Sequence, residues 1–190
     1  MFYDDVIATR SIRRFNPVRT ISRKELLNLI DTARLTPSAA NLQPLKYMAV
    51  CEEERLAKVF PHLRWAGYLT DWDGPEEGER PTGYIIILGD KTISENVVYD
   101  HSIASLAIML GATELGLGGC IIGAVDREGL AADMNIDTDR YDILLVCALG
   151  KPAEKVMLEE VPEGASIKYY RDANDVHCVP KRTLKEVVID

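Results

Sequence analysis

The sequence predicts an α+β fold in which helices pack on a small sheet. Three apolar, β-rich runs predict strands at residues 47–51, 84–88 and 142–149. The helical segments between them do not alternate regularly with the strands, as they would in a βαβ fold. The glycines at 116–119 follow a helix instead of opening one, so they are not the fingerprint of a dinucleotide-binding fold.

The first third of the chain predicts three helices around one strand. A short helix at residues 4–10 runs into a basic segment. The second helix begins at Ser22, because Ser22 and Glu25 have the spacing of a capping box, and it ends before Pro37. After the first strand, residues 52–60 predict a short helix with acids in its first turn, where the helix dipole favours them.

Residues 61–83 predict a long irregular loop. It carries Trp65, Tyr68 and Trp72, followed by an acidic run rich in glycine and proline at 74–79. A long loop in a compact domain is often a functional lid. The alternative is a surface excursion that its aromatic side chains hold in place.

The second half of the chain predicts the longest helix, at residues 95–115. This helix is apolar or small on nearly all sides, which implies burial in a core or a subunit interface. Gly116 is expected to end it, and residues 116–123 to form a glycine-rich bend. Asp126 predicts the N-cap of a further helix, which runs to about residue 135. Residues 151–190 then form a C-terminal extension of one domain that spans 1–190.

Composition and charge argue against several classes of binding partner. The chain is 47% hydrophobic and 27% charged, as in ordinary soluble globular proteins. A net charge of −8 argues against a nucleic-acid or anionic membrane partner, since both need clustered positive charge. No apolar run reaches the roughly 20 residues that cross a bilayer, and no apolar signal segment follows the acidic start. We expect a cytoplasmic protein with neither kind of partner.

Cysteine and histidine residues are scattered without the spacing of metal ligands. The cysteines sit mostly in apolar strand patterns, which is typical of buried thiols in a reducing compartment. The residues are Cys51, Cys120, Cys147, Cys178, His62, His101 and His177. We expect no bound metal.

A basic segment near the start stands out in this acidic chain. Arg10, Ser11 and Arg13 could bind a phosphate, because the arginine fork matches phosphate oxygens and the serine hydroxyl adds a donor. The alternative is a set of surface salt bridges. Lys181 and Arg182 in the extension could fold back onto the same anion or lie in solvent.

The loop at 37–44 is bounded by prolines and combines small residues with carboxamides. Its members are Pro37, Ser38, Ala39, Ala40, Asn41, Leu42, Gln43 and Pro44. The prolines restrict the backbone, and each carboxamide offers a donor and an acceptor. Such a loop suits the edge of a flat heterocycle. The alternative is a helix-to-strand connection that needs proline and serine for its turn.

The glycine-rich bend allows a ligand to approach the backbone closely. Amides near Ile122, Gly123 and Ala124 could donate to a ring atom; the alternative is a helix end followed by a tight turn. No nucleophile–base motif occurs in the sequence, so we expect no catalytic side chain. Binding features without acid–base groups suggest that a cofactor performs the chemistry.

Together, these segments resemble the nitroreductase family of flavin enzymes. The order of motifs matches over nearly the whole chain: residues 10–15, the 37–44 loop, the long apolar helix, the 116–123 bend, residues 149–152 and the basic residues 180–182. The resemblance implies a three-layer sandwich of helices around a small, mostly antiparallel sheet. It also implies an intertwined homodimer with FMN at the subunit interface.

The resemblance also implies roles for individual residues. Arg10, Ser11 and Arg13 would hold the phosphate of tightly bound FMN, with Lys181 or Arg182 as further partners. The isoalloxazine ring would be lined from the other subunit by Pro37, Ser38, Ala39, Asn41 and Gln43. The reactive N5 and O4 edge would receive backbone amides from Ile122, Gly123 and Ala124. Separately, the aromatic residues of the 61–83 loop lead us to hypothesise that Trp65, Tyr68 and Trp72 wall the acceptor site.

The function so implied is an FMN-dependent oxidoreductase. It would pass electrons from NADH or NADPH through flavin N5 to a nitroaromatic, a quinone or an activated alkene, by a ping-pong mechanism. Two alternatives stay open: a flavin-fragmenting or dehalogenating enzyme of the same fold, and a non-catalytic FMN carrier. The chain departs from the family pattern at three positions. Many relatives have an arginine where this chain has Thr9. Some have an aromatic residue in place of Leu45, and some branches have a glutamate in place of Gly123. These departures concern substrate preference more than FMN binding.

Overall fold

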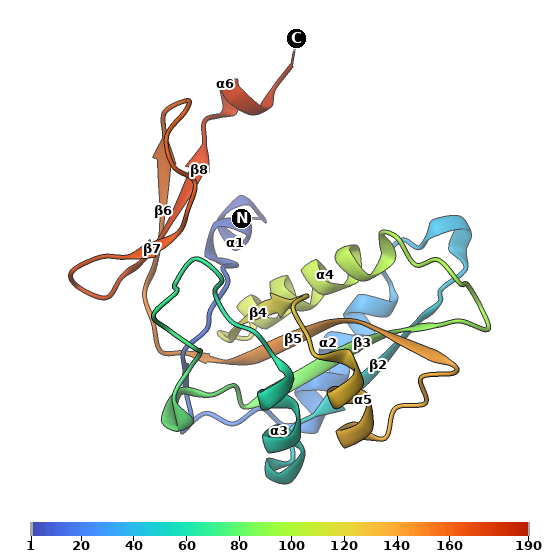
Figure 1. Cartoon of the computed structure of the whole chain (residues 1–190). Helices are drawn as coiled ribbons and strands as arrows, with labels where there is room; N and C mark the ends of the chain where they lie inside the picture. The colour runs from blue at the N-terminus through green and yellow to red at the C-terminus, as the bar shows by residue number, and fades with distance from the viewer. Residues whose placement is uncertain (1, 190) are drawn as a thin grey trace.

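An antiparallel sheet forms the centre of the computed structural model, which describes residues 2–189 (Figure 1). Its strands lie in the order β2-β3-β5-β4, and β1 pairs with the far end of β5. The strands are β1 (Phe15–Asn16), β2 (Leu45–Val50), β3 (Gly83–Asp90), β4 (Gly118–Ile122) and β5 (Tyr141–Pro152). The helices are α1 (Phe2–Ala8), α2 (Arg23–Arg34), α3 (Glu53–Val59), α4 (Asp100–Glu114), α5 (Arg127–Met134) and α6 (Leu184–Val187).

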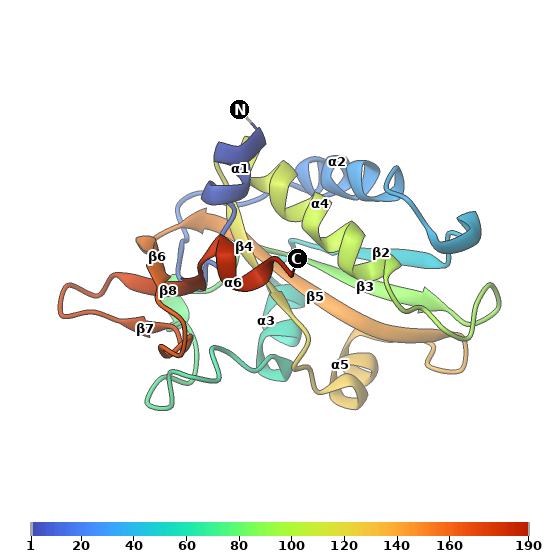
Figure 2. The ribbon, with the colours of Figure 1, turned by 90° about the horizontal axis from the view of Figure 1, so that it is seen from above.

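Strand β3 is buried along its whole length because helices cover both faces of the sheet. Ile85 and Ile87 face one core, which α2 and α4 complete. Tyr84, Ile86 and Leu88 face the other core, which α3 and α5 complete. Figure 2 shows these helix pairs on opposite sides of the sheet. The predicted three-layer α+β sandwich with a small, mostly antiparallel sheet is confirmed.

Two helix caps that the sequence predicts are present. The Ser22 side chain accepts a hydrogen bond from the backbone N–H of Glu25, and the Glu25 carboxylate accepts one from the backbone of Ser22. Asp126 caps α5 by accepting a hydrogen bond from the backbone N–H of Gly129. Gly116, with a φ of 67°, follows α4 as expected. These ends are predictable because each cap lies within a few residues of the helix it closes.

The prediction of a helix at 95–115 is wrong at its start, because α4 begins at Asp100. The carbonyl of Asp90 accepts hydrogen bonds from the backbone N–H groups of Ile93 and Ser94. This turn follows directly on β3 and is extended by a hydrogen bond from Ser94 Oγ to the carbonyl of Asn96. Residues 90–96 therefore form turns, and the helix begins only after them.

The prediction that residues 116–123 form only a bend is also wrong. Residues 118–122 are strand β4, which pairs antiparallel with β5. A Cβ atom on Gly119 would lie 2.3 Å from the carbonyl oxygen of Ala148, so only glycine permits this close strand approach. The glycines therefore serve strand packing as well as the turn.

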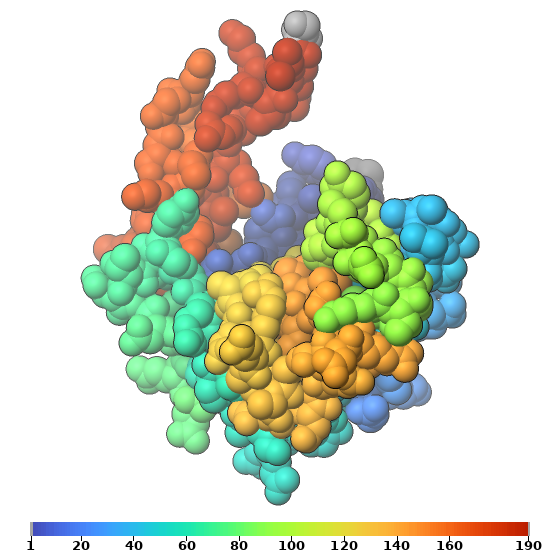
Figure 3. All heavy atoms as spheres, turned by 45° about the vertical axis from the view of Figure 1, so that its right-hand side comes forward, coloured from blue at the N-terminus to red at the C-terminus, as the bar shows by residue number. Residues whose placement is uncertain are grey.

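The C-terminal extension forms a second, three-stranded sheet that the sequence did not predict. Its order is β6-β8-β7, with β6 and β8 parallel. The strands are β6 (Val156–Val161), β7 (Tyr170–Arg171) and β8 (His177–Arg182). Figures 1 and 3 show that the extension stands off the body of the molecule and carries α6 at its end. No helix within residues 2–189 is long and apolar enough to cross a membrane.

Candidate functional site

The basic N-terminal segment lies alongside strand β4. The backbone N–H of Ile12 donates a hydrogen bond of 2.7 Å to the carbonyl of Gly119, and Ser11 forms a parallel bridge with Gly119. This pairing brings Arg13 to the residues that follow β4. Together they line a cavity of about 170 Å³, whose walls are Arg13, Arg64, Trp65, Ala66, Cys120, Ile121, Ile122, Gly123 and Ala124.

Arg13 is the most unusual side chain of this cavity, because its charge is buried and not neutralised. Only 9% of the residue is exposed. Its Nη1 atom lies 3.1 Å from Nε2 of His177, and its guanidinium carbon lies 5.0 Å from the centre of the Tyr169 ring. Within residues 2–189, its Nε is buried without a hydrogen-bond partner and no carboxylate pairs with the guanidinium. Such a group is suited to binding an anion.

The remaining basic residues of the predicted phosphate site have other partners or are exposed. Arg10 donates a hydrogen bond of 2.5 Å to the carbonyl of Val6, and partial burial lowers its pKa from the usual value. Lys181 is exposed, and Arg182 pairs with Glu186 one turn further on. No contact in the described part of the chain joins either tail residue to Arg10 or Arg13.

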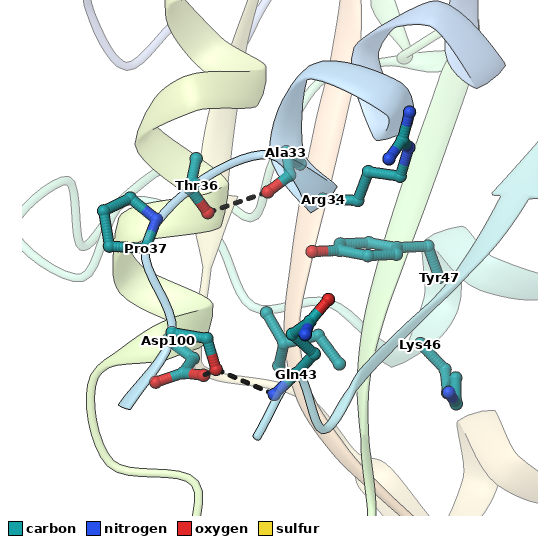
Figure 4. A pocket seen from close by; sticks show the side chains of 10 residues that line it. Ala33, Arg34, Thr36, Pro37, Gln43, Lys46, Tyr47 and Asp100 are labelled. Carbon is teal, nitrogen blue, oxygen red and sulfur yellow. Dashed lines mark hydrogen bonds between the residues drawn. The ribbon is translucent and has the colours of Figure 1, made fainter. Parts of the chain in front are cut away.

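The loop at 37–44 is attached to the first residue of α4. Ser38 Oγ donates a hydrogen bond to Asp100, and the backbone N–H of Ala39 donates to the same carboxylate at 3.1 Å. The backbone N–H of Gln43 in turn donates to Ser38 Oγ at 2.9 Å. Figure 4 shows the carboxylate of Asp100 close to the backbone nitrogen of Gln43. No sequence pattern singled out Asp100, since an acid in the first turn of a helix is common.

The same loop holds three non-glycine residues in the left-handed region. The φ angles of Ala40, Asn41 and Gln43 are 49°, 54° and 53°. Each such residue costs roughly 1–2 kcal/mol, and strained residues cluster at sites that bind ligands. Asn41 and Gln43 are exposed, and the carboxamide nitrogen of Gln43 donates a hydrogen bond of 3.2 Å to the carbonyl of Asn41.

A second cavity, of about 210 Å³, lies beneath this loop (Figure 4). The hydroxyl of Tyr47 points into it between Thr36 and Gln43. Burial raises the pKa of Tyr47 to about 12, so the phenol stays protonated at neutral pH. Arg34, Lys46 and Asp100 also line the space.

The two halves of the predicted site lie at opposite ends of the sheet. In Figures 1 and 2, the loop at 37–44 lies at the start of β2, whereas residues 10–14 lie beside the start of β4. Neither cavity alone reaches the roughly 300–1,000 Å³ of typical pockets for ligands of this size. One copy of the chain does not bring the halves together.

Comparison with known proteins agrees with this architecture. The nitroreductase family model matches residues 6–73 and 78–151, most of the chain. The chain belongs to the nitroreductase family. It is therefore an oxidoreductase, and the resemblance that its motifs suggested is confirmed.

Several nitroreductase relatives align over most of their length. The "Putative NAD(P)H nitroreductase YdgI" of Bacillus subtilis is 25% identical, over 81% of this chain and 90% of its own. A structure titled as a putative NAD(P)H:FMN oxidoreductase from Staphylococcus epidermidis covers 100% of this chain and 95% of its own, with 21% identity and a TM-score of 0.72. A putative nitroreductase from Exiguobacterium sibiricum, solved in complex with FMN, covers 81% of this chain and 89% of its own, with 21% identity and a TM-score of 0.66.

The aromatic residues of this nitroreductase at 61–83 differ in their surroundings. Trp65 is buried and lines the cavity beside Arg13. Two guanidinium carbons lie near the centre of the Trp72 ring, that of Arg14 at 5.8 Å and that of Arg171 at 5.4 Å. Tyr68 packs on Tyr169, with ring centres 4.9 Å apart. The loop is therefore attached to both the N-terminal segment and the C-terminal extension.

The extension also supplies residues that sequence reasoning missed. Glu154 accepts hydrogen bonds from the backbone N–H groups of Arg13 and Arg14, and it pairs with Arg171 at 2.7 Å. His177 and Tyr169 contact the Arg13 side chain. The contacts with Arg13 and Arg14 join residues 140 or more positions apart, so no local signal in the sequence indicates them.

Proposed function

We propose that this protein is an FMN-dependent oxidoreductase that passes electrons from NADH or NADPH to an electron-poor acceptor. The observation that carries the proposal is the buried guanidinium of Arg13, which pairs with no carboxylate among residues 2–189 and shares a cavity with Gly123 and Ala124. An anionic cofactor would supply the missing negative charge. FMN has such a charge, and the E. sibiricum relative of the same fold was solved with FMN.

The residues around Arg13 fit a flavin. A Cβ atom added to Gly123 would meet only a carbon of Leu145 at 3.6 Å, so the backbone there is open to a ring. Arg10, Ser11 and Arg13 would hold the negative charge of the cofactor, and the amides of residues 122–124 would donate to the ring edge. When bound, FMN supplies the acceptance of hydride from a reduced nicotinamide and the onward transfer of electrons.

We also propose that the active species is a homodimer in which each site is completed by the loop at 37–44 of the other copy. This would unite the separated halves and enlarge the small cavity beside Arg13. The ring would then be lined by Pro37, Ser38, Ala39, Asn41 and Gln43. Asp100 would hold this loop, in which Asn41 and Gln43 have left-handed backbone conformations, in place.

The acceptor would bind where the reduced nicotinamide had bound before it. Because the two substrates would occupy the same position one after the other, we expect ping-pong kinetics. Trp65 is placed to contact the acceptor because it lines the cavity. Gly123 leaves no acid beside the ring, so protons would come from solvent. A nitroaromatic, a quinone or an activated alkene meets these requirements.

The proposal is tested with the purified protein and a double variant, Arg10→Ala with Arg13→Ala. The wild type is expected to bind FMN, to show a flavin absorption spectrum, and to oxidise NADH or NADPH when a quinone or nitrofurazone is added. The double variant should be colourless yet dimeric. Arg23→Ala with Arg55→Ala removes the same charge from exposed sites near Glu52 and serves as the control.

Two results would contradict the proposal. Full flavin occupancy in the Arg10/Arg13 variant would remove these arginines from the site. A yellow wild type that oxidises neither nicotinamide with any acceptor would indicate a flavin carrier instead of an enzyme.

A further inference from the structure

We propose that the C-terminal extension is part of the flavin site, with Tyr169 and His177 as positioning residues that hold the Arg13 guanidinium at the cavity wall. This inference rests on the proposed role of Arg13 in binding the flavin. Tyr169 and His177 would explain how the buried Arg13 guanidinium is held in place without a negatively charged partner.

His177 holds Arg13 by accepting a hydrogen bond. Arginine can only donate, so the contact of 3.1 Å between Nη1 and Nε2 requires Nε2 to be unprotonated. The imidazole is then neutral and carries its proton on Nδ1. His177 is 1% exposed, and its Nδ1 is buried without a partner among the described residues. An unsatisfied donor costs free energy, so this arrangement calls for a reason beyond packing.

Tyr169 provides the second contact. Its ring lies 5.0 Å from the guanidinium carbon of Arg13 and 5.3 Å from the His177 ring. Its hydroxyl accepts a hydrogen bond of 3.3 Å from the backbone N–H of Tyr68, which fixes the ring against the 61–83 loop. Arg13 is thus held by an imidazole nitrogen and an aromatic face, neither of which carries negative charge.

The buried carboxylate of Glu154 accepts hydrogen bonds from groups other than the Arg13 guanidinium. Its side chain is 2% exposed. One oxygen accepts from the backbone N–H groups of Arg13 and Arg14, and the other accepts from Arg171. Glu154 therefore fixes the backbone of the basic segment but leaves the side-chain charge of Arg13 available to a ligand.

All of these positioning groups lie beyond residue 151, where the match to the family model ends. The body of the fold supplies Arg13, and the extension determines where its guanidinium lies. Removal of either contact should weaken flavin binding through Arg13 alone.

The test is a double-mutant cycle on FMN affinity, measured by flavin fluorescence with protein freed of cofactor. His177→Leu removes the acceptor and Tyr169→Leu removes the ring, and each should weaken FMN binding about tenfold. In an Arg13→Ala background, neither change should weaken binding further, because both act through Arg13. His177→Gln, whose side-chain oxygen can accept, should restore most of the affinity. Tyr170→Leu, the neighbouring exposed tyrosine, is the matched control and should bind as the wild type.

The outcomes are distinguishable. A wild type that binds no FMN would overturn the proposed function and this inference with it. A wild type that binds FMN, with His177→Leu unaffected or with losses that add to that of Arg13→Ala, would overturn the positioning role alone. Far-UV circular dichroism and thermal melting verify that each variant is folded, and Gln rescue separates the lost hydrogen bond from lost packing.

Discussion

His177 and Asp100 are the buried polar residues that organise the two halves of the proposed site. His177 accepts from Arg13, and Asp100 accepts from Ser38 and from the backbone of Ala39. Both contacts span more than 60 positions of sequence, so each fixes a local conformation from a distant element. Because buried polar groups without partners are costly, loss of either residue should be measurable.

Acidification should weaken the docking of the C-terminal extension through His177. Burial lowers the pKa of His177 to about 4, with a further contribution from the positive charges of Arg13 and Arg171 that outweighs the opposite effect of Glu154. The unfolded chain has a histidine pKa of about 6.5, so between these values the unfolded state binds more protons than the native state. The free energy of unfolding should therefore fall as the pH drops from about 6.5 to about 4.

Urea unfolding of the wild type and of His177→Gln at several pH values measures this effect. The variant should lose less stability over that interval, because it lacks the group that titrates. Parallel curves for the two proteins would show that another residue governs the acid response.

Replacement of Asp100 should loosen the loop at 37–44. Asp100→Ala leaves the hydroxyl of Ser38 and the backbone N–H of Ala39 without their acceptor, which should cost about 2–3 kcal/mol. Amide hydrogen exchange at Ala39 and Gln43 should accelerate. Asp31→Ala, which removes an exposed ion pair with Arg34, should change stability by under about 1 kcal/mol. Equal effects of the two changes would count against the anchoring role.

At the scale of elements, strand β4 connects the fold to the site. It pairs with β5 along one edge, and its residue Gly119 accepts the hydrogen bond from Ile12 that places the basic segment. Residues 122–124, at the end of β4, then reach the cavity beside Arg13. The geometry of the site therefore depends on how closely β4 packs on its neighbour.

Gly119→Ala should destabilise the protein strongly. Its Cβ would lie 2.3 Å from the carbonyl oxygen of Ala148 and 2.7 Å from a carbon of Leu149, so β4 would have to move. The expected loss is about 1–3 kcal/mol or more in the free energy of urea unfolding. Gly78→Ala is the control, since its Cβ would meet nothing within 4 Å, and it should be neutral or slightly stabilising. A neutral Gly119→Ala would contradict the close approach of β4 and β5.

For the whole molecule, three helices each expose apolar residues to solvent. Phe2, Tyr3, Val6 and Ile7 lie on α1, Ile103 and Leu106 on α4, and Leu184 and Val187 on α6. Figure 3 shows a hollow between the extension, in red, and α1, in blue. Exposed apolar residues of this kind are typical of a subunit interface, and in the proposed homodimer the projecting extension would pack against the second copy.

Leu106→Glu should disrupt dimerisation. This residue is 52% exposed on α4, so a charge there costs the monomer little but would be buried in a dimer. Sedimentation velocity should show a shift from dimer to monomer and a parallel loss of flavin. Leu27→Glu, 48% exposed, lies on α2, which is not one of the three helices named above, and should leave the dimer intact. A dimeric Leu106→Glu would place the interface elsewhere.

The sequence alone determined the helices with local caps, the three most apolar strands, the fold class and the family. Ser22 and Asp126 cap helices within three residues of themselves, and the short apolar, β-rich run at 84–88 predicts a buried strand. These elements can be predicted because the residues that determine them are close in sequence. The motif order sufficed for the family for the same reason, since each motif is a short local pattern.

The tertiary structure decided what depends on distant pairing. Gly119 became part of a strand because Ala148 and Leu149 lie beside it, and the extension became a sheet because β8 returns to β6. Arg13 acquired its environment from His177, and the loop at 37–44 acquired its anchor from Asp100. These contacts stabilise the fold only after the chain has closed long loops, so no local run of residues records them.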